Sequence, residues 1–198
     1  MHLILVRHAL PEAADHADGS HADPGLAPEG HAQAARLVDA LAGSGVDALY
    51  TSTMLRAVQT AAPLAAARGV APVTREDLRE YDAERSTYVP VAQMAAADPA
   101  AWERMRAGHL PDHVDGAAFR ARVCGAVEEI VAAHPGRATV VVVAHAGVVN
   151  AYLASTLGIG AGLPFPLDYV GVSRVVCARD GMRKVRTVNE VSHVADLL

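Results

Sequence analysis

Short continuous runs of apolar residues recur along the chain and predict buried strands. The runs at residues 3–6, 46–50 and 139–143 are typical of strands covered on both faces, and a weaker run lies at residues 70–74. Near the C-terminus, polar and apolar residues alternate on both sides of an Arg-Asp-Gly turn, within residues 171–189. That pattern predicts an antiparallel hairpin at the end of the sheet.

Amphipathic and Ala-rich stretches separate these runs and predict helices. The predicted helices cover residues 28–42, 53–68, 117–134 and 147–157. In the second of them, Ser52 or Thr53 is the expected cap, and Pro63 predicts a kink or a late start. Strands that alternate with helices, and that are apolar throughout, predict a three-layer α/β/α sandwich with a mostly parallel sheet.

The pattern changes over residues 79–116, where charged and polar residues dominate. Two short helices are expected there, and Asp98 followed by Pro99 signals the start of the second. A chain of 198 residues fits one domain of ordinary size, or a core with an inserted cap. We therefore expect a single domain over residues 1–198, with a small helical cap inserted at residues 81–116.

Composition excludes several classes of protein. With 52% hydrophobic and 20% charged residues the chain can bury a core, while its net charge of −5 argues against a general nucleic-acid binder. No stretch approaches the roughly 20 apolar residues of a membrane helix. Two distant cysteines and a short apolar start without a basic leader predict a cytoplasmic protein without disulfides or a thiolate metal site.

Charged and polar residues follow the predicted strands at the positions where α/β proteins bind ligands. Arg7 and His8 come directly after the first strand, Arg56 follows the second, His145 follows the strongest one, and Glu80 follows the weak one. Because binding sites form beyond the carboxyl ends of parallel strands, we expect these side chains to share one site.

The chemistry of these residue types is coherent. Guanidinium groups hold phosphate oxygens through paired donors, and a neutral imidazole is a nucleophile toward phosphorus. A second imidazole, expected to be cationic, stabilises charge on the transferring phosphoryl group. A carboxylic acid protonates the departing alkoxide. The residues therefore predict phosphoryl transfer, with no metal and no cofactor.

Six stretches of the sequence form an ordered set. They are Leu-Val-Arg-His-Ala at 5–9, Gly-Leu-Ala-Pro-Glu-Gly-His-Ala-Gln-Ala at 25–34, Ser-Thr-Met-Leu-Arg-Ala-Val-Gln-Thr-Ala at 52–61, Leu-Arg-Glu at 78–80, Phe-Arg-Ala-Arg-Val at 119–123 and Val-Ala-His-Ala-Gly at 143–147. Together they resemble the motifs of the histidine phosphatase superfamily, the phosphoglycerate mutase-like fold. The resemblance covers most of the chain.

The resemblance implies a role for each matching residue. His8 would accept the phosphoryl group, and Glu80 would be the proton donor. The phosphate pocket would comprise Arg7, Arg56 and His145, with the backbone N–H of Ala146. Together these roles describe a metal-independent phosphatase that acts through a phosphohistidine on a small phosphorylated metabolite, as a monomer or a homodimer.

Departures from the family pattern leave alternatives open. Leu10 and Pro11 stand where phosphoglycerate mutases carry polar substrate-binding residues, which weighs against a mutase. A phosphate-binding regulatory module without turnover is a second alternative, opposed by the intact basic set, and a protein-phosphohistidine phosphatase is a third. Asp82 and Glu84 compete with Glu80 as the proton donor. His-rich residues 11–27 are expected to form a solvated flap, since their spacing fits no zinc site.

Overall fold

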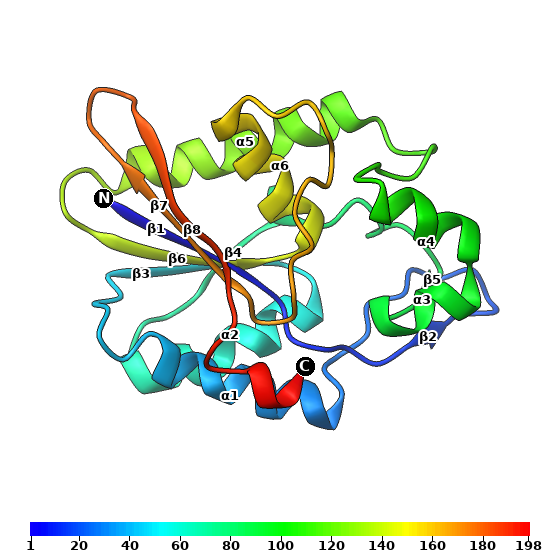
Figure 1. The fold of residues 1–198 in the computed structure, drawn as a ribbon. Coiled ribbons are helices and arrows are strands. Elements are labelled where there is room, and N and C mark those ends of the chain that lie inside the picture. Colours follow the sequence, from blue (N-terminus) through cyan, green and yellow to red (C-terminus); the bar gives the residue numbers. More distant parts are fainter.

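A six-stranded sheet in the order β4-β3-β6-β1-β7-β8 forms the centre of the computed structural model, which describes the backbone of residues 1–198 and the side chains of residues 1–91 and 93–198 (Figure 1). Its strands are β1 (His2–Arg7), β3 (Ala48–Ser52), β4 (Val73–Arg75), β6 (Thr139–Ala144), β7 (Val172–Cys177) and β8 (Arg183–Glu190). The first four are mutually parallel, β7 pairs antiparallel with β1, and β8 pairs antiparallel with β7 at the edge of the sheet. The predicted mostly parallel sheet is confirmed.

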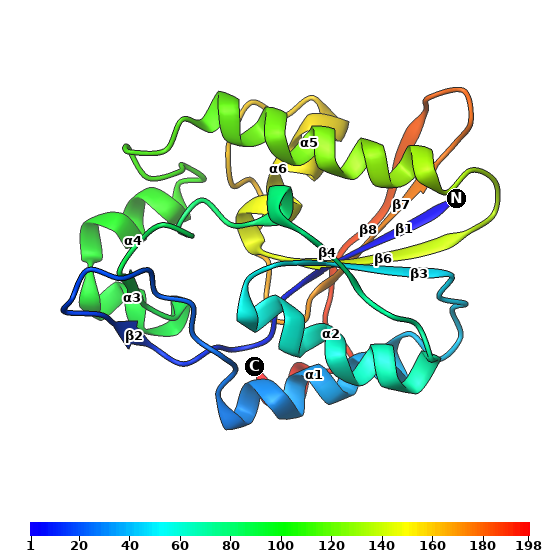
Figure 2. The same ribbon diagram turned by 180° about the vertical axis from the view of Figure 1, so that it is seen from behind.

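Helices cover both faces of the sheet (Figures 1 and 2). One face carries α1 (Pro28–Ala40) and α2 (Leu55–Arg68), and the other carries α5 (Gly116–Ala133) and α6 (Ala146–Leu157). Successive side chains of a strand point to opposite faces, so Leu3 and Leu5 of β1 belong to the core under α5 and α6. Ile4 and Val6 belong to the core over α1 and α2. This two-sided burial is the reason that the central strands β1 and β6 carry continuous apolar runs.

Residues 81–116 lie beyond the carboxyl end of the parallel strands (Figure 1). They contain β5 (Thr87–Tyr88), α3 (Val91–Ala97) and α4 (Pro99–Arg106), so both short helices are confirmed. The Asp98 carboxylate accepts the N–H of Ala101 at 2.9 Å and caps α4, as its position before a proline predicted.

A small second sheet was missed in the sequence. Residues 11–27, the expected flap, contribute β2 (Ala14–Asp15), which pairs antiparallel with β5. Backbone bonds from His16 to Ser86 and from Ala22 to Arg85, at 2.9 and 2.8 Å, continue the contact. Two-residue strands carry no alternation that a sequence pattern can show, because only the pairing defines them.

The start of α2 corrects the expected cap. The helix begins at Leu55 after Met54, and Pro63 lies well inside it, so the late start is wrong. The Leu55 N–H donates to both carboxylate oxygens of Asp23, at 2.9 and 3.1 Å, and the Ser52 hydroxyl accepts only from Met54. Asp23, a loop residue distant in sequence, thus accepts a hydrogen bond from an N–H at the start of the helix that has no partner within the helix. Among the described residues, no helix is both long enough and apolar enough to span a bilayer.

Candidate active site

The four basic residues predicted to share a site lie together where the parallel strands end. Arg7 is the last residue of β1, and His8 extends the β1–β6 pairing by donating its N–H to Ala144 at 2.8 Å. Arg56 lies in the first turn of α2, and His145 occupies the turn between β6 and α6. All four are at least 95% buried, and the rings of His8 and His145 are 5.1 Å apart between centroids.

The ring of His8 is held in one tautomer. Its Nδ1 lies 2.8 Å from the carbonyl oxygen of Ala9, and a carbonyl only accepts, so Nδ1 carries the hydrogen. Nε2 therefore keeps its lone pair. Burial, followed by the charges of Arg56 and Arg7, holds the pKa of His8 well below its ordinary value. The neutral ring is the form that attacks phosphorus.

Each arginine of the site is oriented by an aromatic ring and one polar partner. The Arg7 guanidinium lies 3.9 Å from the ring centroid of Tyr169 and donates from Nη1 to the carbonyl of Leu167 at 2.6 Å. The Arg56 guanidinium lies 4.6 Å from the ring centroid of Tyr88 and donates from Nη2 to Asp82 at 3.0 Å. These contacts limit side-chain freedom before any anion binds.

Several donors of the basic residues remain unpaired. Arg7 Nε, Arg56 Nε and Nη1, and both ring nitrogens of His145 are buried and have no hydrogen-bond partner among the described residues. An unpaired buried polar group costs about 1–3 kcal/mol, so a convergent set of them favours an oxyanion. The set suits phosphate, whose oxygens accept several bonds at once.

The charge state of His145 depends on its surroundings. Burial, with the charges of Arg56, His8 and Arg7, holds its pKa well below the ordinary value, so the ring is neutral before substrate binds. Burial and the neighbouring positive charges thus disfavour a cationic ring in the ligand-free protein, and the cationic imidazole expected during phosphoryl transfer stays a prediction. A neutral ring still offers one N–H donor, and a bound phosphate dianion would raise its pKa.

Among the three candidate acids, Glu80 is the buried one, whereas Asp82 is half-buried and Glu84 is exposed. The side chain of Glu80 accepts the N–H groups of Gly147 at 2.7 Å and of Tyr81 at 3.1 Å. Burial, reinforced by the charge of Asp82, raises the pKa of Glu80 to about 7. Asp82 is instead the ion-pair partner of Arg56, and the exposed Glu84 pairs with Arg79 at 2.9 Å. A carboxyl that titrates near neutral pH suits an acid that must also act as a base.

A substitution at Gly147 can test whether activity depends on the position of the Glu80 carboxyl. A Cβ at this residue would clash with Glu80 Oε1 and would lie 2.9 Å from the Tyr81 ring, so Gly147→Ala must shift both neighbours or the start of α6 itself. We expect a roughly 10- to 100-fold loss in kcat for alkyl phosphates and a smaller loss for p-nitrophenyl phosphate. Steady-state assays on both esters measure it. The control is Gly125→Ala on α5, where a Cβ meets open space and activity should stay the same.

Sequence reasoning missed the residues that orient the predicted ones. Thr60 accepts the N–H of Ala9 at 2.9 Å and donates to the Arg56 carbonyl at 2.7 Å, which ties the loop after β1 to α2. Its position four residues after Arg56 was the only signal. Tyr88 and Tyr169 gave no signal, since Tyr88 reaches the site from the two-residue strand β5 and Tyr169 from the loop before β7, both distant in sequence. Ala146 opens α6, where helix N–H groups lack helical partners, and its contact with phosphate stays a prediction.

The fold and the site together define an α/β/α protein with a buried cluster of two arginines and two histidines whose chemistry suits an oxyanion, beside a carboxyl that titrates near neutral pH. Within the described residues, no group of three or more His, Cys, Asp or Glu side chains is arranged to hold a metal ion. The family model of the histidine phosphatase superfamily (branch 1) matches residues 3–190. The chain belongs to this superfamily, and the resemblance of its motifs is confirmed.

Solved structures of similar fold include several phosphatases. Bacillus stearothermophilus YhfR is 25% identical, with a TM-score of 0.75 and 98% of both chains covered. The phosphoserine phosphatase of Entamoeba histolytica, in complex with 3-phosphoglyceric acid, is 18% identical, with a TM-score of 0.74 and 98% of both chains covered. The mycobacterial glucosyl-3-phosphoglycerate phosphatase Rv2419c, in complex with VO3, is 23% identical, with a TM-score of 0.75, covering 95% of this chain and 98% of that one.

Among curated proteins, the Bifunctional protein Rv2228c of Mycobacterium tuberculosis is 29% identical over 199 residues, which cover 97% of this chain and 54% of that protein. The Uncharacterized protein Rv0525 of the same organism is 37% identical over 120 residues, 54% of this chain and 58% of that protein. The chain thus spans about half the length of the curated relatives it matches.

Proposed function

We propose that this chain hydrolyses phosphomonoesters of small molecules through a phosphohistidine on His8, without a metal ion. One observation carries the proposal. The unprotonated Nε2 of a neutral His8, whose tautomer is fixed, lies in a buried cluster with arginine and histidine nitrogens that have no partner among the described residues. Membership of the histidine phosphatase superfamily supports this reading.

In the first step His8 Nε2 attacks phosphorus, and the bond from phosphorus to the ester oxygen breaks. Arg7 and Arg56 neutralise the charge on the non-bridging oxygens, and the N–H of His145 donates to one of them. Glu80 gives its proton to the departing oxygen, which leaves as an alcohol. This step needs Glu80 in its protonated form.

In the second step the Glu80 carboxylate takes a proton from water, and the oxygen of that water attacks the phosphohistidine. The bond from phosphorus to Nε2 breaks, which releases phosphate and restores neutral His8 and protonated Glu80. The carboxyl therefore acts first as acid and then as base, which requires a pKa near the working pH. A pKa of about 7 meets that requirement.

Residues 81–116 act in this proposal as a cap that receives the rest of the substrate. The cap touches the site through Asp82 and Tyr88, the two residues that orient Arg56. It also contacts residues 11–27 through the β2–β5 pairing. The substrate is thus held at its phosphate by the core and at its alcohol portion by the cap.

Release of inorganic phosphate tests the function. Purified protein should hydrolyse p-nitrophenyl phosphate and some phosphorylated metabolites equally well with and without a chelator, and vanadate should inhibit it strongly, because five-coordinate vanadate resembles the transition state. Strict dependence on an added metal would refute the proposal. Transfer of phosphate between positions of a phosphoglycerate, without net release, would identify a mutase instead.

A further inference from the structure

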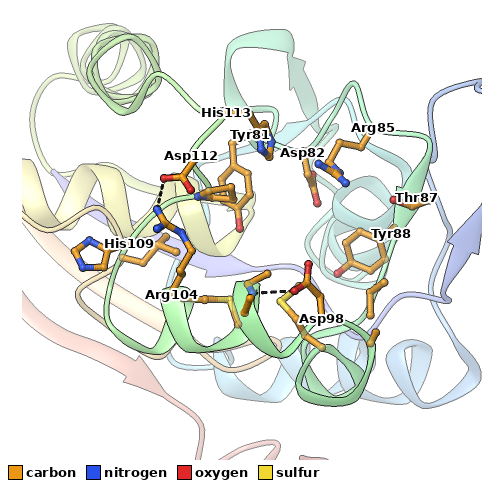
Figure 3. Close-up of a pocket in the computed structure, with 18 residues that line it drawn as sticks. Tyr81, Asp82, Arg85, Thr87, Tyr88, Asp98, Arg104, His109, Asp112 and His113 are labelled. Atoms are coloured by element: carbon orange, nitrogen blue, oxygen red, sulfur yellow. Dashed lines mark hydrogen bonds and ion pairs between the residues drawn. The ribbon is translucent and has the colours of Figure 1, made fainter.

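A cavity of about 400 Å³ lies beside the candidate site, enclosed by residues 81–116 (Figure 3). Three of its lining residues contact the proposed catalytic groups directly. Asp82 and Tyr88 hold the Arg56 guanidinium, and the N–H of Tyr81 donates to the carboxyl of Glu80. A phosphate held by Arg56 and protonated at its bridging oxygen by Glu80 therefore has its alcohol portion at the mouth of this cavity. Cavities of this volume hold small organic molecules.

Much of the cavity wall is apolar. Aromatic, aliphatic and thioether side chains all contribute to it, and the large ones are Tyr81, Tyr88, Val89, Met94, Met105 and Leu163. Figure 3 shows Tyr81 and Tyr88 pointing into the space that α4 closes from the other side. Met side chains adapt to the shape of an apolar ligand. The wall thus favours a substrate whose alcohol portion is apolar over one whose alcohol portion is a polyol.

Most charged groups of the wall are already paired. Asp82 is bonded to Arg56 at 3.0 Å, Asp98 caps α4 through the N–H of Ala101, and Arg104 pairs with Asp112 at 2.6 Å. Arg85 is an exposed lining cation for which no ion pair is found in the described part of the chain. A carboxylate among the apolar side chains would lose its hydration, because the lining groups without a partner among the described residues, Arg85, His109 and His113, are exposed to solvent.

We propose that the substrate is the phosphate monoester of an uncharged alcohol with an apolar, ring-sized body, which the cavity lined by Tyr81, Tyr88, Met94 and Met105 receives. This inference rests on the proposed phosphatase function and deepens it. It predicts that a phosphorylated carboxylic acid, whose leaving group carries a negative charge, is a poor substrate.

A series of primary alkyl phosphates tests the proposal, because their alcohols depart with similar difficulty and differ only in what enters the cavity. The series is 3-phenylpropyl phosphate, propyl phosphate, the phosphate ester of 4-hydroxybutanoate, and glucose 6-phosphate. We expect kcat/KM for the phenylpropyl ester to exceed that of each of the others by about 10- to 100-fold. Phosphate release from each ester measures the ratios.

A matched pair of variants locates the effect. Ala101→Phe, on the face of α4 that lines the cavity, should lower the ratio of kcat/KM for the phenylpropyl over the propyl ester by about tenfold. Ala96→Phe introduces the same ring at an exposed position of α3 outside the lining, and should leave that ratio unchanged. Equal effects of both variants would contradict a role of the cavity.

The remaining outcomes separate the two proposals. A preference for the 4-hydroxybutanoate ester, which Arg85 would explain, or for glucose 6-phosphate would overturn the apolar leaving group and leave the phosphatase function standing. Equal rates for all four esters would also overturn the apolar leaving group, and the phosphatase function would still stand. No phosphate release from any ester, p-nitrophenyl phosphate included, would overturn the function and the inference together.

Discussion

The variant His8→Ala is expected to lose turnover entirely within the range of an ordinary assay, a fall of at least about 10³-fold in kcat. The reason is that Nε2 of His8 is the only protein atom that bonds to phosphorus in the proposed mechanism, and removal of this nucleophile removes the two-step route. Rapid quench of the unaltered protein with labelled substrate should trap a phosphoenzyme that is labile in acid and stable in base. The variant should show no label.

The control for this experiment lies at the other end of the same strand. His2→Ala alters an exposed histidine of β1, and it should leave both label and turnover unchanged. Circular dichroism should show that His8→Ala keeps its fold, since no other described side chain depends on a bond from the His8 ring. Label that persisted in the His8 variant would place the nucleophile elsewhere.

Glu80→Gln is expected to slow the hydrolysis of alkyl phosphates by about 10²- to 10⁴-fold, because an alkoxide departs poorly without a proton. The first step with p-nitrophenyl phosphate should slow much less, since that leaving group departs unprotonated. Phosphoenzyme should then accumulate, because the attacking water has lost its base. Burst kinetics with p-nitrophenyl phosphate measure both effects in one experiment.

The pH profile gives an independent test of Glu80. Burial raises the pKa of this carboxyl to about 7, and its protonated form starts the reaction. We therefore expect kcat/KM for alkyl phosphates to fall as the pH rises through about 7, and the fall to disappear in Glu80→Gln. Since the folded pKa exceeds the ordinary value of 4.5, the free energy of unfolding should also decline as pH rises between these two values. Denaturant titrations at several pH values would show this.

Two neighbouring acids serve as controls. Asp82→Asn removes the charge beside Arg56, and Glu84→Gln alters an exposed ion pair with Arg79. Neither should give the leaving-group-dependent pattern. If Asp82→Asn gives that pattern and Glu80→Gln does not, the proton donor is Asp82 and not Glu80.

The sequence alone determined the architecture and most of the candidate site. Strands that are buried on both faces must be apolar at every position, so β1 and β6 were visible as runs of Leu, Ile and Val. Parallel strands end at the same edge, so the polar residues that follow them had to come together. From this rule the sequence alone predicted that Arg7, His8 and His145 share one site.

The tertiary structure decided what surrounds those residues, and with it their chemistry. Asp82 was an alternative proton donor in the sequence, but it lies against Arg56, 26 positions earlier. The rings of Tyr88 and Tyr169, and the cavity lined mainly by residues 81–116, come from short elements and loops whose placement no periodic pattern shows. The charge states of His145 and Glu80 depend on burial and on charges brought from distant segments. Sequence patterns record which residues a strand must bury, whereas a pKa or a binding cavity depends on non-local neighbours, and only the packed chain determines those.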